Sequence, residues 1–252
     1  MVTAPDCTPG SASARERFPG GLIQPPGSFR FSLDALLLAS FIVNRALVPE
    51  KPASLLDLGC GCGVVGLACL LAHDTLTVCG ADREPLLVDA ARENARLLGI
   101  ADRFSVVCGD FSSEKVRAAL APERVDVVAA NMPYHREGSG RVPQSPLRRR
   151  ALFADSSTIP SFLLAAAGAL RSSGRFCLIY PWRDCESLLA ALRRYGFFIE
   201  EVVSVYTSIV EKTLCLVSAS PRPVAARGET TLRLRGDNGE YTEEAHRFCR
   251  WL

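Results

Sequence analysis

Residues 55–63 read Leu-Leu-Asp-Leu-Gly-Cys-Gly-Cys-Gly, and they are the strongest indication of the fold class of the chain. Apolar residues on both sides of Asp57 predict a buried strand, and the three alternating glycines after it predict a tight turn. A helix is expected to follow directly at Val64–Ala72. In sheets built from such units, the turn lies at the carboxyl end of its strand, where nucleotide-like ligands bind.

Strand-like and helix-like segments alternate outward from this turn. The expected strands are Ser54–Leu58, Thr75–Ala81, Phe104–Cys108, Val125–Ala130, Arg175–Tyr180, Phe198–Tyr206 and Lys212–Ser220. The expected helices are Val64–Ala72, Pro85–Leu98, Glu114–Leu120, Ser161–Leu170, Cys185–Tyr195 and Thr242–Leu252, with a hairpin around Gly236–Gly239. This alternation predicts an α/β fold with a doubly wound, mostly parallel sheet. The last two strands have too short a link for a crossover, so the final one should run antiparallel.

Three segments are expected along the chain. Residues 1–24 are rich in Pro, Gly, Ser and Ala and predict a disordered arm. Residues 25–220 form the main domain, whose first helix is expected to be capped by Ser32 and to act as a lid that brings Asp34 to the ligand. Residues 221–252 are expected to be a C-terminal extension packed on the same domain.

Composition narrows the classes of protein that fit. The chain has 252 residues, 48% of them hydrophobic and 22% charged, with a net charge of +2, which is the balance of a globular protein that could be a monomer or a homodimer. The longest apolar runs are shorter than the ~18 residues of a membrane span, and the N-terminus lacks a secretory signal. Ten cysteines without CxxC spacing predict a reduced, cytoplasmic chain, and three histidines predict no metal site.

The glycine motif can be aligned in two registers. Residues 61–66 match the GxGxxG fingerprint of dinucleotide-binding proteins, so a nicotinamide-dependent oxidoreductase is one alternative. However, Asp57 stands before the first glycine, where it can meet an ammonium group that S-adenosylmethionine has and a nicotinamide dinucleotide lacks. Asp82 and Asp110 end the next two strands, where they suit a ribose and an adenine amine. The candidate cofactor-binding residues are Asp34, Asp57, Gly59, Cys60, Gly61, Gly63, Asp82, Arg83, Asp110, Phe111 and Asn131.

The fourth expected strand runs directly into Asn131-Met132-Pro133-Tyr134. The exocyclic amine of adenine is a poor nucleophile because its lone pair is delocalised into the ring. The Asn131 side-chain oxygen and the Met132 carbonyl, which Pro133 holds in extended backbone, can accept hydrogen bonds from such an amine and free the lone pair. Tyr134 can stack on the base. These four are the candidate catalytic residues.

The pattern DLGCGCG, then D, GD and N-x-P-Y, resembles class I S-adenosylmethionine-dependent methyltransferases that act on amino groups. More narrowly, RFSLDALLLA, NMPY, SPLRRRALFA, EKTLCLV and GEYTEEAHRF resemble the bacterial tRNA adenine-N6 methyltransferases that modify valine tRNA, over residues 27–252. This resemblance implies a seven-stranded Rossmann-like sheet with the last strand inserted antiparallel, and a target amine held by Asn131, Pro133 and Tyr134. Met132 replaces the first proline of the usual Asn-Pro-Pro-Tyr.

An RNA partner, and tRNA in particular, is also indicated by the loop after the tetrapeptide. Its candidate RNA-binding residues are Arg136, Arg141, Arg148, Arg149 and Arg150, against the single acid Glu137. Other functions stay open: a protein glutamine N-methyltransferase, whose relatives carry a larger N-terminal helical domain; another RNA or DNA amino-methyltransferase; and a non-catalytic RNA-binding module. The oxidoreductase alternative lacks a Tyr-x-x-x-Lys pair.

Overall fold

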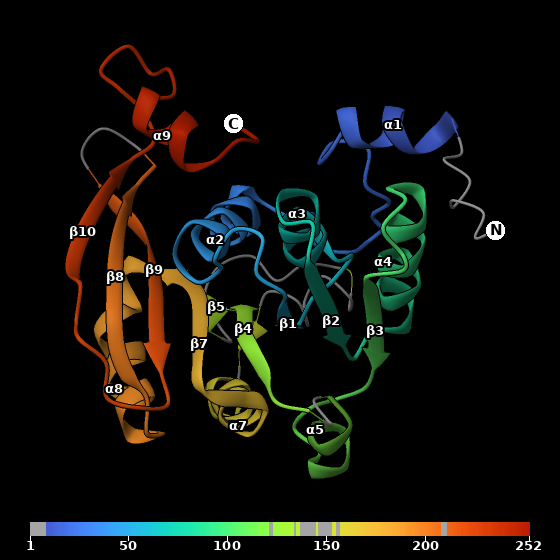
Figure 1. The fold of residues 1–252 in the computed structure, drawn as a ribbon. Coiled ribbons are helices and arrows are strands. Elements are labelled where there is room, and N and C mark those ends of the chain that lie inside the picture. The colour runs from blue at the N-terminus through green and yellow to red at the C-terminus, as the bar shows by residue number, and fades with distance from the viewer. Residues whose placement is uncertain are drawn as a thin grey trace.

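The structure is a computed structural model that describes residues 9–120, 123–133, 135–136, 145, 153–154, 157–207 and 211–252. Its centre is a strongly twisted eight-stranded sheet of order β10-β8-β9-β7-β4-β1-β2-β3 (Figure 1). The strands are β1 Ala53–Leu58, β2 Leu76–Asp82, β3 Phe104–Cys108, β4 Val125–Asn131, β7 Leu170–Pro181, β8 Phe198–Tyr206, β9 Lys212–Ser220 and β10 Gly228–Arg233. Neighbours in this sheet are parallel except β9, which runs antiparallel to both β7 and β8. The predicted antiparallel insertion is confirmed.

Helices cover both faces of the sheet. They are α1 Pro9–Glu16, α2 Leu33–Arg45, α3 Val64–Ala72, α4 Pro85–Leu97, α5 Glu114–Leu120, α7 Thr158–Ala169, α8 Cys185–Arg194 and α9 Glu243–Phe248, with a 3-10 turn η1 at Trp182–Asp184. One hydrophobic cluster joins the sheet to α2, α3, α4 and α9, and a second joins it to α5, α7 and α8. A separate pair, β5 His135–Arg136 and β6 Phe153–Ala154, is parallel. None of the described helices is long and apolar enough to cross a membrane.

Two elements near the C-terminus differ from the predictions. The sheet has eight strands rather than seven, because β10 pairs parallel to β8 as a new edge. Only Leu232 of this strand is buried, so its sequence carries little apolar alternation. The terminal helix covers six residues, Glu243–Phe248, and is shorter than predicted. The predicted hairpin is present: the Gly239 amide donates to the Gly236 carbonyl at 2.9 Å, and Arg235 pairs with Tyr241.

The N-terminal segment is ordered where it is described, so the predicted disorder of residues 1–24 is wrong for residues 9–24. The buried Phe18 ring meets the Trp251 ring edge-on at 5.8 Å, which joins the two ends of the chain. Arg15 also donates from Nε to the Leu98 carbonyl at 2.7 Å. These partners lie far away in sequence, which local composition does not reveal.

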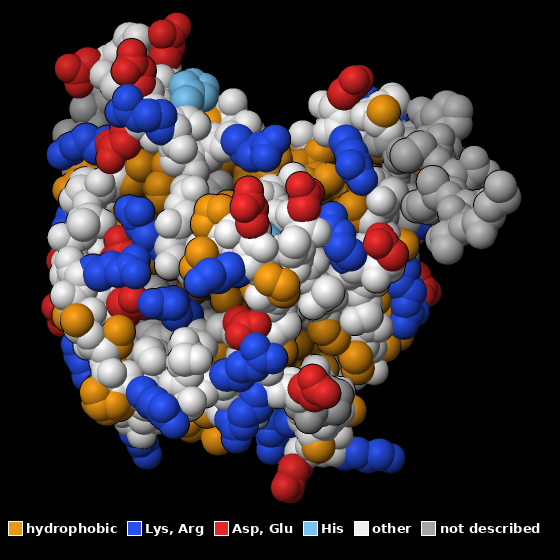
Figure 2. Space-filling model, viewed as in Figure 1, with side chains coloured by type: hydrophobic (Ala, Val, Ile, Leu, Met, Phe, Trp, Pro, Cys, Tyr) orange, Lys and Arg blue, Asp and Glu red, His pale blue; other side chains and the backbone are white. Residues whose placement is uncertain are grey.

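In the space-filling view, the C-terminal extension and the α1 region rise on either side of a hollow above α2 and α3 (Figure 2).

Candidate active site

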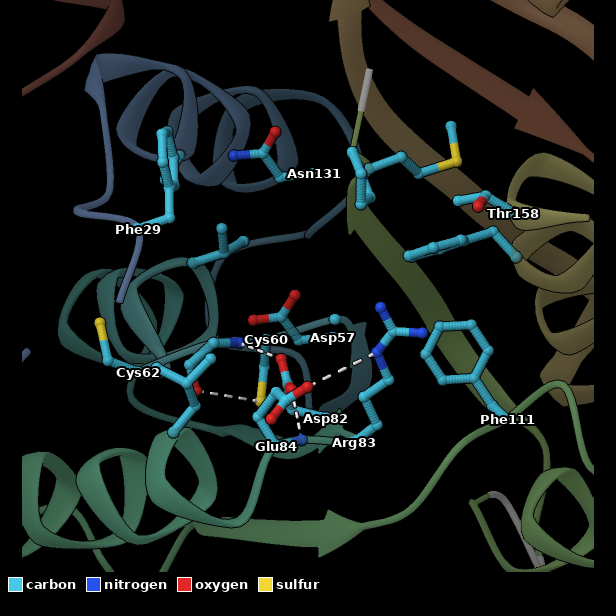
Figure 3. Close-up of a pocket in the computed structure, with 18 of the residues that line it drawn as sticks. Phe29, Asp57, Cys60, Cys62, Asp82, Arg83, Glu84, Phe111, Asn131 and Thr158 are labelled. Atoms are coloured by element: carbon cyan, nitrogen blue, oxygen red, sulfur yellow. Dashed lines mark hydrogen bonds and ion pairs between the residues drawn. The ribbon is translucent and has the colours of Figure 1, made fainter. Parts of the chain in front are cut away.

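A cavity of about 310 Å³ lies at the carboxyl ends of β1, β2, β3 and β4 (Figure 3). Because these ends meet at one edge of the sheet, residues that are far apart in the sequence converge there. Every candidate cofactor-binding residue lines this cavity except Gly63. Asn131, Met132 and Pro133 line it too, so the expected cofactor and acceptor sites share one space.

The glycine turn exposes backbone to the cavity. Gly59 and Gly61 have left-handed φ angles of 69° and 56°, which favour glycine. A Cβ on Gly61 would meet nothing within 4 Å, whereas one on Gly59 would lie 3.3 Å from the Phe162 ring. The backbone at Gly61 is therefore open to a closely approaching ligand. Gly63 instead caps α3 at a φ of 89°, where a Cβ would lie 3.1 Å from Leu67.

Asp57 is a buried carboxyl group in the wall of the cavity. It is 1% exposed, and its Oδ2 accepts the Gly66 backbone N–H at 3.1 Å. Burial raises its pKa to about 7; the Gly66 hydrogen bond opposes this rise and the charge of Asp82 adds to it. A carboxylate that is shielded from water is strongly stabilised by a cationic partner, so Asp57 can bind an ammonium group.

Asp82 joins the second strand to the glycine turn. Its Oδ2 accepts the Gly61 N–H at 2.9 Å, and its Oδ1 accepts the Glu84 N–H at 2.9 Å. Burial raises the pKa of Asp82, and these two backbone hydrogen bonds partly offset that rise. Each carboxylate oxygen has a second lone pair, which leaves capacity for the hydroxyls of a ribose.

The third strand supplies a polar and an apolar group. Asp110 accepts the Ser112 N–H at 2.8 Å, and the next residue, Phe111, is buried against Phe162 with ring centroids 4.8 Å apart. This aromatic pair gives the cavity an apolar wall that suits a planar ring. The two thiols of the glycine turn are not nucleophiles, because burial raises the pKa of Cys62 to about 11 and that of Cys60 well above its usual range.

The acceptor side begins at Asn131, the last residue of β4. Its amide points toward Phe29, which also lines the cavity (Figure 3). Met132 is 1% exposed, belongs to the core cluster around α5, α7 and α8 and also lines the cavity, so an apolar side chain fits this position. Tyr134, Arg141, Arg148, Arg149 and Arg150 lie outside the described residues. Arg136 is in β5, where only its backbone is described.

Several lining residues were not predicted. Thr158, Ser161 and Phe162 reach the cavity from α7, where the Phe162 ring lies against Gly59 of the glycine turn. Their sequence is that of an ordinary helix start, so nothing in it signals a site. Phe29 and Phe31 come from the segment before α2, where the FRF pattern was a usable signal. Ser32 is the N-cap residue of α2, as predicted, but its side chain makes no capping hydrogen bond.

Residues 28–190 match the methyltransferase small domain family. The chain belongs to this family. It is 26% identical over 184 residues to a tRNA1(Val) (adenine(37)-N6)-methyltransferase of Porphyromonas gingivalis, covering 72% of this chain and 69% of that protein. It is 29% identical over 173 residues to the release factor glutamine methyltransferase of Escherichia coli, covering 66% of this chain and 60% of that protein.

A solved structure agrees on the fold. A protein from Agrobacterium tumefaciens, described as a predicted O-methyltransferase, superposes with a TM-score of 0.65 at 19% identity, over 85% of this chain and 94% of that one. The chain is thus an S-adenosylmethionine-dependent methyltransferase with a Rossmann-like fold. The oxidoreductase alternative is set aside.

The residues of the cavity fit S-adenosylmethionine. The methyltransferase offers a buried carboxyl group at Asp57, an open glycine backbone at Gly61, a second carboxyl group at Asp82 and an apolar wall at Phe111. When bound, the cofactor supplies an electrophilic methyl group on a sulfonium. Among the residues that the structure describes, no group of His, Cys, Asp and Glu could hold a metal ion.

Cofactor affinity is expected to depend on pH through Asp57. Below its pKa of about 7 this group is protonated and pairs poorly with an ammonium, so affinity should fall by up to tenfold per pH unit. Above about pH 8 the α-amino group of the cofactor loses its own proton. Calorimetric titrations should therefore give the tightest binding between about pH 7 and 8, with net proton release at more acidic pH. Unchanged affinity across the acidic range would contradict the role of Asp57.

Proposed function

We propose that this methyltransferase transfers its methyl group to the exocyclic amine, N6, of an adenine in a tRNA loop. The observation that carries the proposal is Asn131 at the end of β4, facing the same cavity as Asp57 and Asp82. This arrangement can bring an amine next to a methyl donor. The name of the relative from Porphyromonas gingivalis supports adenine in tRNA as the acceptor.

In this proposal, the chain prepares the amine for attack. Asn131 accepts one N–H through its side-chain oxygen, and Met132 accepts the other through its carbonyl. Two accepted hydrogen bonds draw the amine toward tetrahedral geometry and free its lone pair. The nitrogen–carbon bond forms as the carbon–sulfur bond breaks, and the methylated amine loses its extra proton to water. Most of the rate gain comes from alignment, because a correctly oriented pair of reactants avoids a large entropic cost.

The acceptor base must leave any stack to enter the cavity edge-first. Flipping a base out costs a few kcal/mol from a duplex and less from a loop, which favours a loop substrate. We propose that Tyr134 stacks on the flipped base and that the arginines of residues 136–150 hold the flanking phosphates.

All nine described cysteines are free, which supports action in a reducing cytoplasm. The monomer or homodimer expected from composition stays a prediction.

The second candidate acceptor is a protein glutamine. A side-chain amide is planar and carries two N–H groups, so it fits the same pair of acceptors. The likeness to the Escherichia coli release factor glutamine methyltransferase, at 29% identity, favours this alternative specifically.

A parallel assay separates these acceptors. Labelled S-adenosylmethionine is offered with bulk tRNA, duplex DNA and a glutamine-bearing release factor domain, each at the same concentration. We expect label in tRNA, recovered as N6-methyladenosine after nucleoside digestion. Transfer to tRNA should fall steeply as salt rises, because phosphate contacts release counterions. Label on the release factor domain or the duplex, with none on tRNA, would overturn the proposal.

A further inference from the structure

Asn94, on α4, makes three hydrogen bonds from one buried amide. It is 1% exposed and does not line the cavity. Its Oδ1 accepts the Ile23 N–H at 2.7 Å, and its Nδ2 donates to the Ile23 carbonyl at 3.1 Å. The same Nδ2 donates to the Cys62 carbonyl in the glycine turn at 3.0 Å. One side chain thus ties three segments together that are far apart in sequence.

The segment that Asn94 holds leads into the wall of the cavity. We call residues 22–32 the strap. Within it, the Gln24 side chain accepts the Phe31 N–H at 3.1 Å, and the Ser28 hydroxyl donates to the Pro25 carbonyl at 2.7 Å. The strap then places Phe29 and Phe31 in the cavity wall before it enters α2.

Two walls of the cofactor cavity therefore share one anchor. The strap forms one of them and the glycine turn forms the other, and Asn94 bonds to both. Without the amide, three buried or half-buried backbone groups lose their partner, and the two walls are free to separate. A displacement of about 1 Å at a binding site is enough to cost up to 100-fold in function.

We propose that Asn94 is a positioning residue for S-adenosylmethionine, which fixes the strap against the glycine turn. The inference rests on the cofactor of the family and does not depend on which acceptor is methylated. It also separates the two roles of the site, since Asn131 and Pro133 on the β4 side have no contact with Asn94 among the described interactions.

The test compares Asn94→Ala and Asn94→Asp with the wild type. In Asn94→Asp, a carboxylate oxygen can still accept the Ile23 N–H, but the two hydrogen bonds that Asn94 donates are lost. The Asp side chain has nearly the same shape as the Asn side chain. Both variants should raise the calorimetric Kd and the KM for S-adenosylmethionine by about tenfold or more, the effect of losing one to two hydrogen bonds. At saturating cofactor, kcat should stay within about threefold.

Arg15→Ala is the matched control. Arg15 lies in α1, before the strap, and donates to the Leu98 and Gly99 carbonyls just after α4. It does not contact the glycine turn. Its loss should leave cofactor affinity unchanged. An equal loss of affinity in Arg15→Ala, or an Asn94 variant that changes only the melting temperature, would overturn the proposal.

Hydrogen exchange on the wild type keeps the test independent of variant folding. Saturation with S-adenosylmethionine should slow exchange of the Ile23 amide, because the ligand closes the walls that Asn94 joins. The same slowing with S-adenosylhomocysteine would support the proposal, since no methyl transfer is involved. An exchange rate of the Ile23 amide that neither ligand changes would overturn the proposal.

Discussion

Replacing Asn131 by Ala is expected to slow methyl transfer by about 10³-fold while cofactor affinity stays within a few-fold. In the proposed mechanism, its side-chain oxygen accepts one of the two hydrogen bonds that the target amine donates, and it is the one supplied by a side chain. Losing one preorganised hydrogen-bonding group at a reacting centre costs about 10²–10³-fold in rate. The loss should be at the upper end here, since the amine would return to its planar, unreactive form. Single-turnover rates with tRNA at saturating cofactor measure the effect, and calorimetry measures the affinity.

Asn44→Ala is the control for this substitution. Asn44 is also an amide near the end of its element, α2, and its Nδ2 donates to the Phe248 carbonyl at 2.9 Å, away from the cavity. This variant should turn over normally. If Asn131→Ala also retained near-normal turnover, the mechanism based on Asn131 and Met132 would be wrong, whatever the acceptor proves to be.

Replacing Asp57 by Asn should lower the affinity for S-adenosylmethionine by about 100-fold or more, because a buried charge left without its partner costs ~3–5 kcal/mol. The Asn side chain can still accept the Gly66 N–H, so the first turn of α3 keeps its anchor. The effect therefore reports the charge of Asp57 and not its shape. Calorimetric titration near pH 7.5, about the expected optimum, is the measurement.

The same variant should be more stable than the wild type without ligand at alkaline pH. The folded pKa of Asp57, about 7, lies above its ordinary value of 3.8. The stabilising contribution of the protonated form is therefore complete below about pH 4 and is lost as pH rises through about 7. The amide that replaces this carboxyl group cannot ionise, so the ligand-free variant should melt at a higher temperature at about pH 8, and the gain should vanish at acidic pH.

Asp126→Asn is the control for both measurements. Asp126 is a carboxyl group on β4 that accepts the Ser54 N–H at 2.9 Å and pairs with Arg171, outside the cavity. It should change stability but not cofactor affinity. A pH-dependent gain in stability in this variant, or normal cofactor binding in Asp57→Asn, would contradict the assignment.

Local sequence patterns are enough to predict several parts of this protein. The strand–glycine–helix unit at residues 55–72 depends on apolar residues a few positions apart, and on glycines that reach left-handed backbone. Asp57, Asp82, Asp110 and Asn131 were predictable as one site for a further reason. Each lies at or close to the carboxyl end of a strand, and parallel strands bring these ends to one edge.

Other features depend on residues that are far apart in the sequence, and they become visible once the chain is folded. Phe162 enters the cavity from α7, and Phe18 is buried by Trp251 from the other end of the chain. Asn94 meets Ile23 across 71 positions of sequence. A helix start, an N-terminal arm rich in small residues and a mid-helix asparagine look ordinary in sequence. Their roles arise because the packing of distant segments determines which residues are buried and which are hydrogen-bonded. The periodicity of the local sequence does not indicate how those segments pack.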